Sequence, residues 1–134
     1  MTPEITGLVK QTLKGDNVSL SRVISLVENE SSQVSGIMKL IAPHLGKAHC
    51  IGMTGPPGVG KSTLVDKLTA LMRTQGLKVG IVAVDPSSPF TGGAVLGDRI
   101  RMQQHYLDDG VFIRSMATRG SLGGLPQTAG SVIK

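Results

Sequence analysis

The sequence predicts an α/β fold in which a helical extension precedes a parallel sheet. Apolar residues recur with helical spacing throughout residues 1–46, and from residue 47 onward strand-like and helix-like segments alternate. A glycine-rich segment separates the first expected strand from the helix that follows it. Because strand–helix–strand–helix–strand order is typical of doubly wound sheets, we expect two domains: a helical extension, residues 1–46, and an α/β part, residues 47–134.

Three amphipathic helices are expected in the extension. Their apolar stripes are Ile5, Leu8, Val9 and Leu13; then Leu20, Val23, Ile24 and Val27; and finally Val34, Ile37, Met38 and Ile41. Residues 15–17 and the polar stretch 28–32 separate these helices, and Pro43 with Gly46 ends the third. Three short helices offer little core of their own, so we expect them to pack against another part of the protein.

The α/β part is expected to contain three strands and two helices. A short apolar run predicts a buried strand at His49–Thr54, in which Cys50 is a small core residue. The helix after the glycine-rich loop should bury one face and end at Gly76; that face carries Leu64, Leu68, Leu71 and Met72. The continuous apolar run in 78–85 predicts a strand covered on both faces. A loop at 86–93, a helix at 94–107 and a strand at 111–114 complete the pattern.

Composition excludes several classes of protein. Only 17% of the residues are charged and 40% are hydrophobic, which excludes intrinsic disorder. Aromatic residues make up 2%, so stacking on nucleic-acid bases is not expected. The net charge is +5, and most of the excess positive charge lies after residue 47. The Lys and Arg residues there form no cluster, which favours a small phosphorylated molecule as the ligand. One cysteine and no apolar leader favour a cytoplasmic protein. No apolar run is long enough to span a membrane, so no membrane partner is expected. No nucleic-acid partner is expected either.

The glycine-rich segment, GPPGVGKS, fits the phosphate-loop pattern GxxxxGKS/T between an expected strand and helix. Glycines let successive amides turn inward around a β-phosphate, and the helix start adds unpaired N–H groups. Lys61 supplies charge between the β- and γ-phosphates, and the Ser62 hydroxyl is a hard ligand for Mg²⁺. The residues expected to hold the nucleotide are Gly55, Pro56, Pro57, Gly58, Val59, Gly60, Lys61, Ser62 and Thr63.

Two acidic residues downstream are candidates for the same site. Asp85 ends the second expected strand, and the carboxyl ends of parallel strands line the ligand crevice. It lies near the metal or the attacking water, or else caps a turn. Asp98 either coordinates Mg²⁺ through water or is a solvated residue of a helical turn. Arg119 contacts phosphate or a partner, or is only a surface arginine. The three histidines lack metal-ligand spacing.

Three segments together resemble the MeaB/ArgK/MMAA family of GTPases, which are chaperones of cobalamin-dependent methylmalonyl-CoA mutase. They read GMTGPPGVGKSTLVDKL, VGIVAVDPSSPFTGGAVLGDRIRM and IRSMATRGSLGG. The resemblance implies a P-loop GTPase that hydrolyses GTP slowly and loads or protects the mutase. It implies that Lys61, Asp85 and Asp98 act in catalysis and that Ser62, Asp85 and Asp98 surround the magnesium. It also implies a homodimer for the full-length protein.

The same resemblance predicts that the chain is an N-terminal part of such a GTPase. The family's switch strand of ETVGVGQ type and its guanine-reading NKxD-type element do not occur in the 134 residues. Two other functions stay open on the residues alone: a small-molecule P-loop kinase or ATPase, and a fragment without catalytic activity.

Overall fold

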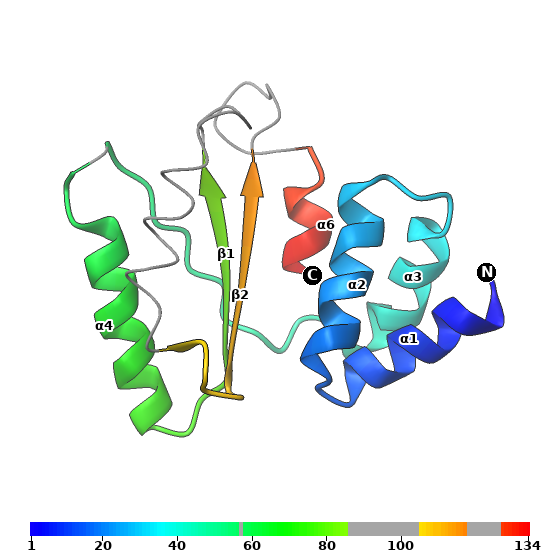
Figure 1. Cartoon of the computed structure of the whole chain (residues 1–134), viewed down its shortest axis with the longest axis horizontal. Coiled ribbons are helices and arrows are strands. Elements are labelled where there is room, and N and C mark those ends of the chain that lie inside the picture. Colours follow the sequence, from blue (N-terminus) through cyan, green and yellow to red (C-terminus); the bar gives the residue numbers. More distant parts are fainter. Residues whose placement is uncertain (57, 86–104, 118–126) are drawn as a thin grey trace. The chain divides into compact units, whose positions relative to one another are not determined.

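The computed structural model describes residues 1–56, 58–85, 105–117 and 127–134 (Figure 1). Their elements, in chain order, are α1 (Pro3–Leu13), α2 (Asn17–Glu28), α3 (Val34–Ile41), the 3₁₀ turn η1 (Ala42–His44), α4 (Lys61–Thr74), β1 (Val79–Asp85), β2 (Val111–Ala117) and α6 (Ala129–Ile133). The chain divides into a helical unit, residues 1–49 with 127–134, and a sheet unit, residues 50–126.

The first three helices begin and end where the sequence predicts. The Thr2 hydroxyl caps α1 by accepting from the Ile5 amide at 3.4 Å, and Pro3 occupies the first turn. Gly15 then reverses the chain at a φ of +94°. The Asp16 carboxylate caps α2 by accepting from the Ser19 amide at 2.9 Å. Hydrogen bonds from the side chain of Ser19, first, and from its backbone amide lower the pKa of Asp16. Local capping therefore accounts for the breaks between these helices.

The helical unit has its own core, contrary to the expectation that its helices must lean on another part. Val9, Val23 and Ile37 are buried together, one from each helix. The partly buried residues around them are Ile5, Leu8, Leu26, Leu40 and Ile41. The predicted stripes are thus correct, and they face one another because each helix presents an apolar face of about 100° to the other two.

A short C-terminal helix, α6, also belongs to this unit. It contacts α2, and its Ala129 is buried. The sequence interpretation missed this helix and assigned residues 127–134 to the α/β part. The reason is that the helix is only a turn and a half long, too short for a periodic pattern.

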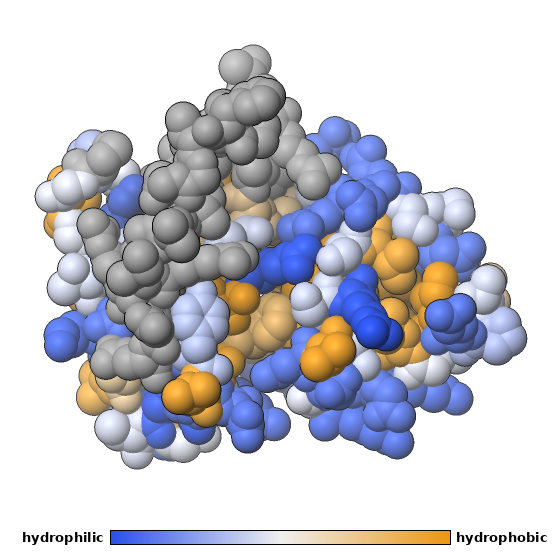
Figure 2. Space-filling view, in the orientation of Figure 1, coloured by the Kyte–Doolittle hydropathy of each residue, from blue (hydrophilic) through white to orange (hydrophobic). Residues whose placement is uncertain are grey.

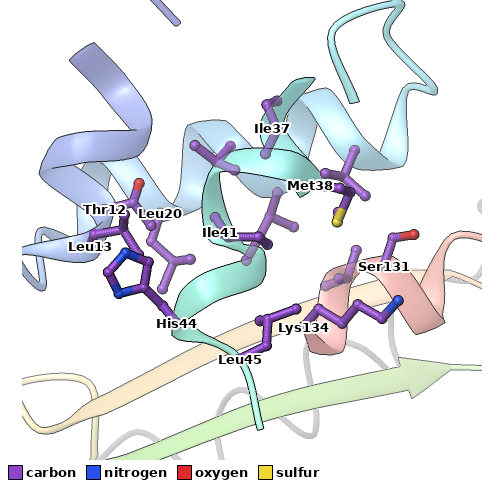
Figure 3. A pocket seen from close by; sticks show the side chains of 14 residues that line it. Thr12, Leu13, Leu20, Ile37, Met38, Ile41, His44, Leu45, Ser131 and Lys134 are labelled. Carbon is purple, nitrogen blue, oxygen red and sulfur yellow. The ribbon is translucent and has the colours of Figure 1, made fainter. Parts of the chain in front are cut away.

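The surface of the helical unit is mixed in character. Figure 2 shows hydrophilic residues over much of it, with hydrophobic residues exposed in separate places. A mostly apolar pocket lies among α1, α2, α3 and α6 (Figure 3), with His44, Ser131 and Lys134 among its polar lining. Among the helices that the structure describes, none combines the length and apolar character needed to cross a membrane.

The sheet unit contains a parallel pair of strands, as predicted. β1 pairs with β2 in a register that aligns Val79 with Val111 and Asp85 with Ala117. β2 is longer than the predicted strand at 111–114. Parallel pairing places the carboxyl ends of both strands at one edge, which is the edge where ligands bind in α/β sheets.

The prediction of a strand at His49–Thr54 is wrong. This segment forms no strand, Ile51 is 51% exposed, and Cys50 is exposed rather than in a core. An extended segment becomes a strand only when a neighbour accepts and donates its backbone hydrogen bonds. Among the described residues, β1 and β2 pair only with each other.

The helix after the loop is confirmed, but its predicted apolar face is only partly buried: Leu68 and Met72 are half-buried. α4 begins at Lys61 and ends before Gly76, whose φ is +75°. Leu64 and Leu71 are each 56% exposed, whereas Thr69 is 2% exposed. α4 contacts β1, and the side turned inward is the Thr69 side. The predicted loop at 86–93 lies outside the described residues, as does most of the helix at 94–107.

Candidate functional site

The loop that precedes α4 has a backbone that only glycine adopts easily. Gly58 has a φ of +81° and Gly60 a φ of +89°. A Cβ at either position would meet no atom within 4 Å, so space is not the reason for glycine there. The reason is the left-handed backbone, which costs other residues roughly 1–2 kcal/mol. The spacing predicted from the motif therefore coincides with the conformation that the loop requires.

The N-terminus of α4 is suited to an anion. Its N-cap is Gly60, which supplies no side-chain hydrogen bond, and its first turn carries no acidic residue. The first N–H groups of a helix have no partner within the helix, and the helix dipole places partial positive charge there. Ser62 is half-buried in this turn and Thr63 is exposed. Backbone amides, a hydroxyl and the dipole thus converge on one place.

Lys61 folds back over the loop. Its Nζ donates a hydrogen bond to the carbonyl oxygen of Gly55. A Cβ on Gly55 would come within 3.3 Å of Cγ2 of Val59 and 3.7 Å of Cδ of Lys61. The absence of a side chain at Gly55 therefore lets the loop close tightly, with the ammonium group across it.

The structure places the strand ends at the same edge as this loop. Figure 1 shows α4 running antiparallel to β1, so the start of the helix and the end of the strand lie at one edge of the sheet unit. Asp85 is the last residue of β1. Pro57, Asp98 and Arg119 lie outside the described residues, so their predicted roles stay predictions.

Sequence reasoning missed two polar links between α4 and the turn that leads into β2. His105, which was assigned no chemistry, is 6% exposed, and its Nε2 lies 2.7 Å from Oδ1 of Asp66. The Arg73 guanidinium makes a two-pronged contact with the Asp108 carboxylate, at 2.8 and 2.9 Å. Partners 35 and 39 residues apart carry no local sequence signal, so only the folded chain reveals them.

The Arg73 link is reinforced by its surroundings. The guanidinium also donates to the Leu77 carbonyl at 2.8 Å, and the Gly110 amide donates to Asp108 at 2.9 Å. A Cβ on Gly110 would overlap Cζ of Arg73, so the guanidinium occupies the space of that missing side chain. The hydrogen bond from Arg73 lowers the pKa of Asp108, and the same bond raises that of Arg73.

The apolar pocket of the helical unit is separate from this site. None of its lining residues belongs to the loop or to α4. Its walls are mostly aliphatic, and no glycine is among the described residues that line it.

Comparison with known families gives a direct match. Residues 20–134 match the family described as methylmalonyl-CoA mutase-associated GTPase MeaB. The chain belongs to this family. The match includes the loop, α4 and both strands, and it confirms the family that the three sequence segments predicted.

Individual relatives agree with this assignment. The chain is 58% identical over 130 residues to a protein of Pyrococcus horikoshii named as a GTPase, covering 97% of this chain and 41% of that protein. It is 37% identical over 125 residues to the GTPase ArgK of Escherichia coli, covering 90% of this chain and 38% of ArgK. The chain thus spans about two fifths of the length of these relatives.

A third relative is shorter. A Streptomyces virginiae protein, described by its position in the 3′ region of mutB, is 42% identical over 93 residues; these cover 66% of this chain and all of that protein.

Proposed function

We propose that this chain binds GTP and GDP through residues 55–63 and hydrolyses GTP slowly. The observation that carries the proposal is the loop itself, in which two left-handed glycines lead into an uncapped helix start beside the Lys61 ammonium. Membership of a family of GTPases supports guanine as the base. A P-loop kinase or another ATPase would use the same loop, but no described residue favours either one.

In this proposal, the residues of the loop divide the phosphates among them. Amides from Gly58 to Lys61 donate to the β-phosphate, and Thr63 reaches the α-phosphate. Lys61 exchanges its hydrogen bond with the Gly55 carbonyl for one with the β- and γ-phosphates. Because that carbonyl is a neutral acceptor and phosphate is charged, the exchange favours the bound state.

Magnesium fits the donor chemistry of the helix start. The Ser62 hydroxyl is a hard oxygen ligand beside the loop, and Asp85 ends the strand at the same edge. We assign Ser62, Asp85 and Asp98 to the magnesium and its waters, and Lys61, Asp85 and Asp98 to catalysis. When bound, Mg²⁺ neutralises charge on the β- and γ-phosphates. The residues of the chain hold that ion and orient the attacking water.

The cellular role follows from the family. We propose that the whole protein uses its GTP cycle to load cofactor into, and to protect, a cobalamin-dependent methylmalonyl-CoA mutase. The family description and the relative near mutB support this partner. A homodimeric full-length protein and a cytoplasmic location are part of the same proposal, as are domain boundaries at 1–46 and 47–134. We propose neither a nucleic-acid nor a membrane partner.

Titration of the purified chain with fluorescent GDP and ADP, with Mg²⁺ present, tests the nucleotide site. We expect GDP to bind and the Lys61→Ala variant to bind about 10- to 100-fold more weakly, because a hydrogen bond to a charged group is worth about 1.5–3 kcal/mol. The matched control is Lys67→Ala, which removes an exposed lysine from the same helix and should bind like the unchanged chain.

Each departure from this result has a distinct meaning. Equal losses in both lysine variants would show that net charge, rather than the loop, attracts the nucleotide. Preference for ADP would contradict the guanine assignment. No binding of either nucleotide by the unchanged chain would overturn the proposed function for this polypeptide.

A further inference from the structure

We propose that His105 is a positioning residue for the nucleotide site: through Asp66 it holds α4 in the orientation that presents Lys61 and Ser62 to the phosphates and magnesium. This inference rests on the proposed function, because it assigns a role within the same site. His105 is far from the loop in sequence, and it belongs to none of the motifs that identify the family.

The contact between His105 and Asp66 is short and buried. The His105 ring is 6% exposed, and its Nε2 lies 2.7 Å from Oδ1 of Asp66 and 3.3 Å from the Asp66 carbonyl oxygen. The Asp66 side chain is 14% exposed. Nε2 is within reach to donate to this carboxylate, since an ionised carboxylate only accepts hydrogen bonds. A buried imidazole thus reaches both the side chain and the backbone of one residue of α4.

The position of Asp66 on α4 lets its contact with His105 affect the nucleotide site. It comes four residues after Ser62, which places both on the same face of α4, one turn apart. A helix moves nearly as a rigid rod over one turn, so a shift at Asp66 carries Ser62 and the first-turn amides with it. Misplacement of catalytic or ligand groups by about 1 Å can cost roughly 100-fold in function.

Among the described residues, α4 has one fully buried side chain, and its apolar side chains are at most half-buried. Its fully buried residue is Thr69, whose hydroxyl is used locally, donating to the Val65 carbonyl at 2.7 Å. Leu64 and Leu71 point outward. Two long-range polar contacts of α4 lie within the described part of the chain: His105 with Asp66 near the middle of the helix, and Asp108 with Arg73 at its C-terminal end. The His105 link is the nearer of the two to the phosphate site, so it sets the orientation of the helix start.

Two substitutions separate the hydrogen bond from the ring. His105→Phe keeps an aromatic ring without the donor, and His105→Gln restores a donor on a different side chain. We measure GDP affinity at saturating Mg²⁺ and the Mg²⁺ concentration that gives half-maximal GDP binding. We expect His105→Phe to raise that Mg²⁺ concentration about tenfold, as loss of residues that support metal ligands typically does. We expect His105→Gln to recover most of it.

Arg73→Gln is the matched control, because it breaks the other polar link of α4 without touching the helix start. We expect it to lower thermal stability and to leave the Mg²⁺ dependence unchanged. Equal Mg²⁺ shifts in Arg73→Gln and His105→Phe would overturn the proposal, since a general loosening of the unit would then explain both. An Mg²⁺ requirement for GDP binding that is unchanged in His105→Phe would overturn the proposal as well.

The same measurements distinguish this inference from the proposed function. An unchanged chain that binds no nucleotide contradicts both, whereas a His105→Phe variant that binds GDP with the same Mg²⁺ requirement as the unchanged chain contradicts the inference alone. Should His105→Phe fail to unfold cooperatively, Asp66→Ala replaces it, because it removes the same hydrogen bond from the other side. The Mg²⁺ requirement of Asp66→Ala is then compared with those of Arg73→Gln and the unchanged chain, and the same results support or overturn the proposal.

Discussion

Gly58 and Gly60 have a backbone conformation that side chains oppose, although each has empty space where a Cβ would stand. The left-handed turn at Gly60 ends the loop and leads directly into the first turn of α4. Its carbonyl accepts from the Leu64 amide at 2.9 Å, the first bond of the helix ladder. The conformation of one residue therefore decides both where the helix begins and where its unpaired amides point.

Gly60→Ala tests this conformational requirement. We expect the substitution to destabilise the sheet unit by about 1–2 kcal/mol, because the left-handed backbone is strained for alanine. We also expect it to weaken GDP binding. Gly52→Ala is the control, since its added Cβ also meets nothing and its φ lies outside the left-handed range. Urea unfolding and GDP titration of both variants provide the measurement. Equal behaviour of the two variants would contradict a role for the backbone at Gly60.

At the scale of secondary-structure elements, Arg73 and Asp108 join the end of α4 to the turn before β2. Asp108 also accepts from the Gly110 amide, and the Gly110 carbonyl accepts from the Val79 amide of β1 at 2.9 Å. One ion pair thus connects a helix end, a turn and the beginning of each strand. The hydrogen bond from Arg73 lowers the pKa of Asp108.

This shift predicts a pH dependence of stability. A carboxyl whose pKa is lower in the folded chain stabilises the fold fully above its unfolded pKa, about 3.9 for Asp, and loses that contribution as pH falls through the folded pKa. We expect the unfolding free energy of the unchanged chain to exceed that of Asp108→Asn at pH 7. The difference should shrink below about pH 4.

Urea unfolding between pH 7 and pH 3 measures this difference. Asp109→Asn is the neighbouring control, because Asp109 is exposed and should show a smaller loss at neutral pH. A difference between the unchanged chain and Asp108→Asn that stays constant down to pH 3 would contradict the role of the ionised carboxylate.

At the scale of the whole molecule, the chain contains two compact units with different means of stabilisation. The helical unit packs aliphatic side chains from three helices around Val9, Val23 and Ile37. The sheet unit depends on the parallel pairing of β1 with β2 and on polar links to α4. Among the described residues, the helical unit therefore has an apolar cluster shared by three helices, and the sheet unit adds polar links between α4 and the turn before β2.

Ile37→Ala tests the core of the helical unit. Ile37 is completely buried, so we expect its truncation to cost about 2–5 kcal/mol through lost burial and a residual cavity. Val18→Ala, at a position 64% exposed in α2, should change stability by less than about 0.5 kcal/mol. Thermal unfolding measures both, and GDP titration of Ile37→Ala should show affinity close to that of the unchanged chain. A strong loss of affinity there would contradict the separation of core and site.

Local patterns predicted much of this structure. The three stripes of apolar residues and the break at residues 15–17 locate α1 to α3, and the GKS segment locates the start of α4. Signals that depend on distant partners were misread. Cys50 reads as a core residue from its apolar neighbours, yet burial requires another element to cover it. The loop residues could be predicted from the motif, whereas His105 and Arg73 could not, because each acts through a distant carboxylate.

By itself, the sequence determined the family, the helices α1 to α4 and the glycine positions of the loop before α4, because periodicity and glycine conformation act over a few neighbouring residues. Only the tertiary structure decided which face of α4 is buried, that the three N-terminal helices share a core, and that His105 meets Asp66. These features depend on which surfaces meet once the chain has folded, and contacts between residues dozens of positions apart leave no periodic trace in the sequence.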